Sequence, residues 1–169
     1  MKSVLMSIKP EYCELIAAGI KTVEVRKSKP QIKTPFKCYI YCTKKFYKKG
    51  DGYFQGKCYG KVIGEFICDK VEPIVYVKNG YLHIEEAGTC LSGQELTDYY
   101  NGSKIYGWHI SNLVICDKPK ELSEFKRINR ECWYADLGLA KRDCPECHNR
   151  ECFFTRPPQS WCYVEDIKL

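Results

Sequence analysis

Alternating apolar and polar positions predict a chain built mainly of β-strands. Runs rich in β-branched, aromatic and cysteine residues recur along it, with polar turns between them, as in strands that are half or fully buried in a sheet. The predicted strands cover residues 3–8, 21–27, 36–43, 57–71 with an extension over 74–77, 105–116 and 160–167. Gly64 predicts a bulge or bend in the fourth of these runs, and Pro119 is expected to end the strand that begins at residue 105.

Apolar residues at helical spacing predict two short helices and one further helical turn. The segment 10–18 begins with a proline, which suits a first helical position, and ends before a glycine. Ser92 and Glu95 have the spacing of a capping box, which predicts a second helix over residues 93–100. A helical turn is expected at 121–126. The pattern lacks βαβ alternation and indicates an α+β, mainly β fold, either a small mixed β-barrel or a strongly twisted sheet.

The predicted strand over residues 21–27 carries the most unusual polar face in the chain. Alternation places Thr22, Glu24 and Arg26 on one side and two valines on the other, with Lys21 expected on the valine side. Covering a hydroxyl, a carboxylate and a guanidinium costs free energy unless these groups pair or meet a ligand. We therefore expect this strand to form one wall of a functional cleft.

Two interpretations of this face remain open. Glu24 and Arg26 can form a structural ion pair. Alternatively, Arg26 binds a phosphate while Glu24 accepts hydrogen bonds from a base edge. Lys21 then neutralises a phosphate or, if it is desolvated, acts as a base or nucleophile.

Length and composition predict one domain over residues 1–169 with a real core. The chain has 169 residues, of which 44% are hydrophobic. No apolar run approaches the roughly 18 residues of a membrane span, and the N-terminal residues lack a secretory pattern, so we expect no membrane association. Twelve cysteines without a secretory signal indicate free thiols in a reducing compartment, and hence a cytoplasmic protein.

The basic charge is concentrated in the first third of the chain. Residues 1–50 contain 12 Lys and Arg against 3 Glu, whereas the whole chain has a net charge of only +6. This asymmetry favours a phosphate-bearing partner. The alternative is a solvated, lysine-rich surface.

Residues 129–155 form a polar, cysteine-bearing insertion. Two of its cysteines form a C-x-x-C pair, and the others lie twelve residues before and five residues after that pair. This spacing predicts a structural zinc site that folds a loop with little core of its own. The predicted ligands are Cys132, Cys144, Cys147 and Cys152. His148 and Cys162 remain alternatives for the fourth ligand, and free thiols are the alternative to any metal.

Three further residues are candidates for the cleft. Trp108 is either a core residue or a stacking surface for an unpaired base. One interpretation places Gln159 and Trp161 in a rigid closure of the barrel. In the alternative, Gln159 reads a base edge beside the 21–27 strand.

Four motifs in this order resemble the ASCH domain family, including its members from bacteria and their phages. They are Ser7-Ile8-Lys9-Pro10-Glu11-Tyr12, the G-x-K-x-x-E-x-R pattern from Gly19 to Arg26, Tyr106-Gly107-Trp108-His109-Ile110, and the closing segment 157–165. The resemblance covers roughly residues 1–124 and 156–166. It implies a PUA-like β-barrel and an RNA-binding module, with the 129–155 insertion outside the common core.

A related branch of this family is implied to hydrolyse the acyl amide of acetylated cytidine. Its strand reads K-T-x-T-x-R, with the lysine, the second threonine and a glutamate elsewhere as catalytic residues. Lys21 and Arg26 match this pattern, and Glu24 replaces the second threonine. The predicted function is therefore binding of RNA or a modified nucleotide in a basic cleft. The alternative is a hydrolase of nucleosides or RNA, either an acylcytidine amidohydrolase that uses Lys21 and Glu24 or a ribonuclease.

Overall fold

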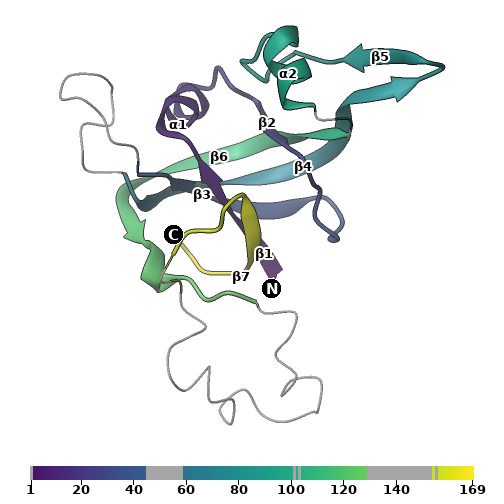
Figure 1. Cartoon of the computed structure of the whole chain (residues 1–169). Coiled ribbons are helices and arrows are strands. Elements are labelled where there is room, and N and C mark those ends of the chain that lie inside the picture. Colours follow the sequence, from purple (N-terminus) through teal and green to yellow (C-terminus); the bar gives the residue numbers. More distant parts are fainter. Residues whose placement is uncertain (1, 45–58, 101, 103, 129–153, 155) are drawn as a thin grey trace, which may run out of the picture.

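The computed structural model describes residues 2–44, 59–100, 102, 104–128, 154 and 156–169, and these residues form one seven-stranded mixed sheet with two α-helices (Figure 1). The strands are β1 (Lys2–Ile8), β2 (Val23–Arg26), β3 (Phe36–Cys42), β4 (Lys61–Lys78), β5 (Tyr81–Ile84), β6 (Ile105–Glu121) and β7 (Trp161–Glu165). The helices are α1 (Pro10–Ala17) and α2 (Gly93–Tyr99), with a 3₁₀ turn η1 (Leu122–Glu124).

The strands lie in the order β2-β6-β4-β3-β1-β7, and β5 pairs with the far part of β4. The β1–β3 pair is parallel and the other pairs are antiparallel. The mainly β, mixed architecture is as predicted. Among the described residues the end strands β2 and β7 do not pair with each other, so the sheet is not closed into a barrel.

Local sequence signals located both helices to within about one residue. Pro10 occupies the first turn of α1, and Gly19 follows the helix with a φ of 72°. The Ser92 side chain and the Glu95 side chain form the predicted capping box at the start of α2. Both helices are short, and each is held by a buried side chain, such as Leu96 of α2.

The two long strands, β4 and β6, are irregular. The prediction for Gly64 holds in them, and the prediction for Pro119 does not. Gly64 lies beside register shifts on both sides of β4, and a Cβ there would stand 2.3 Å from the Val114 carbonyl oxygen, so the predicted bulge is confirmed. The prediction that Pro119 ends its strand is wrong, since β6 continues to Glu121. Pro119 lies within a register shift of the β4–β6 pair, one residue before Lys120, which pairs with Val62. In this irregular stretch the ladder needs no N–H donor from residue 119.

The sequence analysis missed β5, which forms a hairpin with the end of β4. Asn79 and Gly80 connect the two strands, with φ angles of 51° and 81°. Two positive φ angles in a two-residue loop are the signature of a tight hairpin turn, and Asn-Gly is a preferred sequence for it. In Figure 1 the hairpin extends away from the main sheet, next to α2.

Three clusters of buried side chains make up the core. The largest cluster contains residues of α1 and of one face of the central strands, among them Trp108. The second cluster contains Tyr39 and Phe125. The third cluster joins β2, β6 and α2 and includes Val25 and Leu96. Single cysteines pack as small hydrophobes, as expected: Cys38, Cys42 and Cys68 are free and buried. Burial raises the pKa of Cys68 to about 12, so it remains a neutral thiol.

Tyr39 anchors the segment that follows β7. Its hydroxyl lies 2.7 Å from Asp166 Oδ1 and 2.6 Å from the Ile167 carbonyl oxygen, and it accepts from the Ile167 N–H at 2.8 Å. Lys37 adds an ion pair to Asp166, with 3.1 Å between Nζ and Oδ1. The C-terminal segment is therefore tied to the central strand β3.

Replacing Tyr39 by Phe should lower the free energy of unfolding by about 1–2 kcal/mol, because the Ile167 N–H and the Asp166 carboxylate lose a partner. Urea unfolding measures the loss, and hydrogen exchange of the Ile167 amide should accelerate. Tyr41→Phe is the matched control on the same strand, since the Tyr41 hydroxyl makes none of these contacts. Equal exchange rates at Ile167 in both variants would contradict the anchoring role.

Candidate functional site

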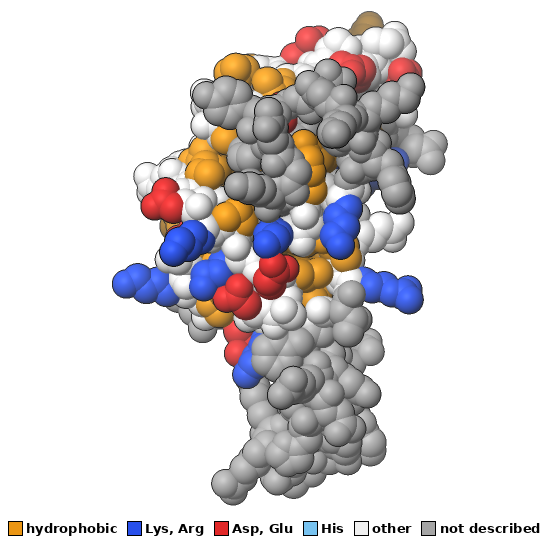
Figure 2. All heavy atoms as spheres, turned by 90° about the vertical axis from the view of Figure 1, so that its left-hand side faces the viewer, with side chains coloured by type: hydrophobic (Ala, Val, Ile, Leu, Met, Phe, Trp, Pro, Cys, Tyr) orange, Lys and Arg blue, Asp and Glu red, His pale blue; other side chains and the backbone are white. Residues whose placement is uncertain are grey.

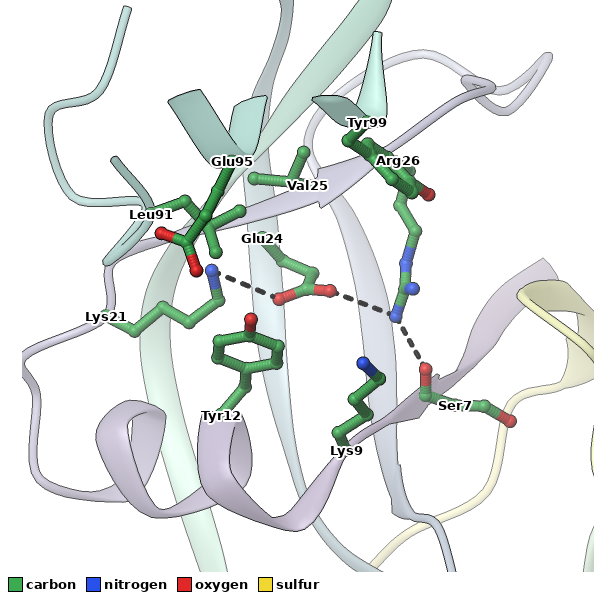
Figure 3. A pocket seen from close by; sticks show the side chains of 10 residues that line it. All are labelled: Ser7, Lys9, Tyr12, Lys21, Glu24, Val25, Arg26, Leu91, Glu95 and Tyr99. Carbon is green, nitrogen blue, oxygen red and sulfur yellow. Dashed lines mark hydrogen bonds and ion pairs between the residues drawn. The ribbon is translucent and has the colours of Figure 1, made fainter. Parts of the chain in front are cut away.

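A pocket of about 250 Å³ lies between α1, β2 and α2 (Figure 3). It contains three cations, two carboxylates and two tyrosines. Its lining residues are Ser7, Lys9, Tyr12, Lys21, Glu24, Val25, Arg26, Leu91, Glu95 and Tyr99. The three residues on which the sequence prediction centred, Lys21, Glu24 and Arg26, therefore meet in one cavity.

Lys21 reaches this pocket because it precedes the strand. The N–H groups of Ile20 and Lys21 both donate to the Leu15 carbonyl, at 2.9 and 3.0 Å, so these residues belong to the turn after α1. Strand β2 begins only at Val23. The expectation that Lys21 shares the valine side is therefore wrong, because strand alternation does not extend back to it.

Glu24 lies between two cations. Its Oε2 is 3.5 Å from Lys21 Nζ, and its Oε1 is 3.1 Å from Arg26 Nη2. Lys21 and Glu24 are only 2% and 5% exposed. The predicted Glu24–Arg26 ion pair is thus present, and it forms part of a buried Lys21–Glu24–Arg26 triad that also faces the pocket (Figure 3).

Other groups hold the two cations of the triad in place. Lys21 Nζ donates to the Thr89 carbonyl and stands 5.0 Å from the centroid of the Tyr12 ring. Arg26 Nη2 donates to the Ser7 carbonyl at 2.6 Å. These contacts join β2 to β1, to α1 and to the loop before α2.

Two buried polar atoms of the triad have no hydrogen-bond partner among the described residues. They are the acceptor Glu24 Oε2 and the donor Arg26 Nε. Buried polar groups are rarely unpaired, because each lost hydrogen bond leaves an uncompensated desolvation cost. Within this part of the chain Glu24 Oε2 has only its ion pair with Lys21 Nζ at 3.5 Å, so hydrogen-bonding capacity remains on one acceptor and one donor of the triad.

Burial lowers the pKa of Lys21, and the neighbouring Glu24 carboxylate partly opposes this effect. The ammonium is therefore easier to deprotonate than that of an exposed lysine. This is the electrostatic condition under which a lysine can act as a base or nucleophile.

Helix α2 supplies two lining residues that the sequence analysis did not assign to the site. Glu95 accepts from the Ser92 N–H at 2.8 Å and from the Ser92 hydroxyl at 2.9 Å, and these hydrogen bonds hold its pKa below the usual value. Tyr99 lies one helical turn later, with Lys27 Nζ 4.5 Å from its ring centroid. Their i, i+4 spacing places them on one helix face, but nothing local indicates that this face meets β2.

The loop between β5 and α2 is fixed to the start of β2. The N–H groups of Thr22 and Val23 both donate to the Gly88 carbonyl at 2.9 Å. Gly88 has a φ of 72°, and a Cβ there would lie 2.2 Å from Thr22 Oγ1. This docking presents the carbonyl of the fully buried Thr89 to Lys21.

The remaining candidate residues lie outside the pocket lining. Trp108 is fully buried, and its Nε1 donates to the Ser28 carbonyl at 3.3 Å. Trp161 packs against it with ring centroids 5.4 Å apart. Gln159 is exposed, but the carbonyls on either side of it, those of Pro158 and Ser160, accept hydrogen bonds from Ser7.

The four predicted zinc ligands, Cys132, Cys144, Cys147 and Cys152, lie outside the described residues, so the zinc site stays a prediction. The alternative ligand His148 lies outside them too. Cys162 packs beside the second core cluster, and burial raises its pKa to about 11. In the described part of the chain, no group of three or more His, Cys, Asp or Glu residues is placed to hold a metal ion.

Side chains of both charges lie on the surface of the described residues. On the face shown in Figure 2, the described lysine and arginine side chains lie among acidic and hydrophobic ones, not in one continuous basic area. Within the described ranges, no helix has the length and apolar character needed to cross a membrane.

Comparisons with known proteins identify a matching family model and two similar solved structures. A family model for the ASCH domain matches residues 6–125. The crystal structure of a mutant ZmASCH protein from Zymomonas mobilis superposes with a TM-score of 0.51 at 19% identity, covering 98% of this chain and 91% of that chain. The structure of ASCH from the same organism gives a TM-score of 0.49 at 19% identity, with coverages of 96% and 87%. No curated protein sequence matches significantly.

Replacing Lys21 by Met tests the burial of its charge. The pKa of Lys21 is lowered in the folded protein. Between that pKa and 10.5 the unfolded chain therefore binds more protons than the folded chain does. The stability of the wild type rises with pH through this window. The difference in unfolding free energy between wild type and Lys21→Met should therefore shift in favour of wild type as pH rises towards 10.5.

Urea unfolding in reductant at several alkaline pH values measures this difference. Lys9→Met is the matched control, because Lys9 lines the same pocket from an exposed position and pays little desolvation on folding. A Lys21→Met difference that stays constant with pH would show that the ammonium is not destabilised by burial.

Proposed function

The chain belongs to the ASCH domain family, and from that premise we propose that the pocket between α1, β2 and α2 binds RNA or a modified nucleotide. The family is PUA-like and is generally linked to RNA binding. The pocket's cations and tyrosines are the residue types that contact phosphates and bases.

The observation that carries the proposal is the unused hydrogen-bonding capacity of the triad, at Glu24 Oε2 and Arg26 Nε. Among the described residues Glu24 Oε2 makes no hydrogen bond, although Lys21 Nζ stands 3.5 Å away, so this carboxylate oxygen keeps acceptor capacity for a donor of a ligand. The unpartnered Arg26 Nε requires an acceptor. Base edges carry donors beside acceptors, as in the exocyclic amine and ring nitrogen of cytosine or adenine.

The dimensions of the pocket favour one base or nucleoside. Its volume of about 250 Å³ is below the roughly 300–1,000 Å³ typical of drug-sized ligand sites. Tyr12 and Tyr99 lie on opposite helices around the triad and offer aromatic surface to a ring (Figure 3). The exposed Lys9 remains available for a phosphate at the rim, whereas Arg26 is held by Glu24 and Ser7.

Glu24→Gln should weaken nucleoside or RNA binding by roughly 10- to 100-fold, the range expected when a hydrogen bond to a charged group is lost. Arg26→Ala should weaken it comparably, because it removes Nε and releases Glu24. Isothermal titration with a panel of unmodified and modified nucleosides and short RNAs measures the affinities. Oligonucleotide binding should also weaken steeply with salt.

Lys29→Ala is the matched control for this experiment, because Lys29 is a cation that does not line this pocket. Thermal unfolding of each variant verifies that it is folded. Folded Glu24→Gln and Arg26→Ala proteins that bind the panel as wild type does would refute the proposed site.

A hydrolase is the second candidate, favoured by one feature of the pocket. Lys21, whose pKa is lowered by burial, shares the cavity with two carboxylates, Glu24 and Glu95. Lysine and glutamate are also the residue types implied for the acylcytidine branch of the family. Against turnover, the Lys21 ammonium is already engaged by Thr89 and Glu24.

Activity assays separate the two candidates. Wild-type protein incubated with N4-acetylcytidine and with RNA should release no acetate and cleave no strand if the pocket only binds. Turnover by wild type that disappears in both Lys21→Ala and Glu95→Gln would replace the binding module by the enzyme. Lys29→Ala again serves as the control for loss of activity through unrelated charge.

A further inference from the structure

The β4–β5 hairpin, residues 75–84, presents two chemically different faces. Across the ladder Tyr76 pairs with His83 and Lys78 with Tyr81, so these four side chains share one face, which we call the aromatic face. Val75 pairs with Ile84 and Val77 with Leu82 on the opposite, aliphatic face. Within residues 75–84 the hairpin contains a lysine and a histidine and no acidic residue, and two exposed glutamates, Glu85 and Glu86, follow it directly.

The aromatic face is open to solvent and already ordered. Tyr81 is 74% exposed, the highest value among the large hydrophobic residues that the structure describes as exposed. The Tyr76 and His83 rings lie parallel, 12° apart in plane with centroids 5.3 Å apart. The Asn79-Gly80 turn holds the two strands in this register.

We propose that the aromatic face is a second contact site, on which unpaired bases of an RNA strand stack. This inference rests on the proposed function, because it extends a nucleic-acid ligand from the pocket to the hairpin. Aromatic rings next to a cation match the chemistry of a single strand, which exposes both base faces and phosphates. A duplex hides its base faces and fits this site poorly.

The strand geometry suits stacking. Tyr81 and His83 are two residues apart on one strand, which separates their side chains by about 6.8 Å. That spacing is twice the ~3.4 Å rise between stacked bases, so the two side chains can contact different bases of one strand. A second base can extend the Tyr76–His83 stack from its outer side.

The hairpin and the pocket are joined by a short connection. Residues 85–92 lead from β5 to α2, and within them Gly88 binds the start of β2 while Thr89 binds Lys21. Helix α2 then contributes Glu95 and Tyr99 to the pocket, and in Figure 1 it lies beside the hairpin. The connection therefore links the hairpin to the pocket, and Leu96 of α2 packs in one core cluster with Ile74 and Val75 at the base of the hairpin.

The test compares ligands that reach only the pocket with ligands that reach both sites. Titrations use a nucleoside and single-stranded RNAs of about 4 to 16 nucleotides, with wild type and the double variant Tyr81→Ala/His83→Ala. The variant should bind the longer RNAs about 5- to 100-fold more weakly and the nucleoside unchanged. In wild type, the His83 imidazole resonances should shift on adding the longer RNA.

The aliphatic face provides the matched control, Val77→Thr/Leu82→Thr, which should bind every RNA as wild type does. If both double variants bind long RNA as wild type does, the hairpin contact is refuted while the pocket stands. If wild type binds no nucleoside or RNA, the proposed function fails and this inference fails with it. A third outcome would also overturn the proposal. In it, Tyr81→Ala/His83→Ala binds RNA as wild type does, and wild type shows a concentration-dependent self-association that only Val77→Thr/Leu82→Thr loses. The hairpin would then be a protein interface.

Discussion

The structure depends on holding one carboxylate, that of Glu24, between two cations while removing it from water. Desolvating Glu24 alone would cost several kcal/mol, and only close cations and hydrogen bonds offset such a cost. Lys21 and Arg26 supply the cations, but each must itself be held, by Thr89 and by Ser7. This requirement explains why a strand of only four residues is fixed from β1, from the turn after α1 and from the loop before α2.

Because these supports come from distant parts of the chain, the site is a product of the tertiary fold. Ser7 and Arg26 are joined across the side of the sheet where β2 lacks a second strand neighbour, and Lys21 meets a carbonyl 68 residues later. The third core cluster, with Val25 and Leu96, packs α2 over the same strand. Apolar packing and polar contacts thus act jointly to place the triad under α2. Loss of the packing or of the polar contacts would open the pocket.

The elements that the sequence predicted well are those with local causes. Pro10, the Ser92–Glu95 capping box and Gly64 act within a few residues, and each acts as expected. The errors and omissions have non-local causes. Lys21 faces Glu24 because a turn interrupts strand alternation, and which face of α2 meets β2 depends on tertiary packing. The Asn79-Gly80 signal for β5 was present but lay within a segment too short to show alternation.

The composition of the triad also limits how this site can change during evolution. With Glu24 present, the three side chains carry a net charge of about +1. Exchange of Glu24 for threonine, as in the related hydrolase pattern, would leave two buried cations facing each other without an anion. Since that pattern keeps both the lysine and the arginine, an anion would have to come from another position, such as the glutamate that the pattern implies elsewhere in the chain. Substitution of a carboxylate by a hydroxyl at position 24, or the reverse, therefore requires a second, compensating substitution. The two forms of the pocket are not connected by a single neutral mutation.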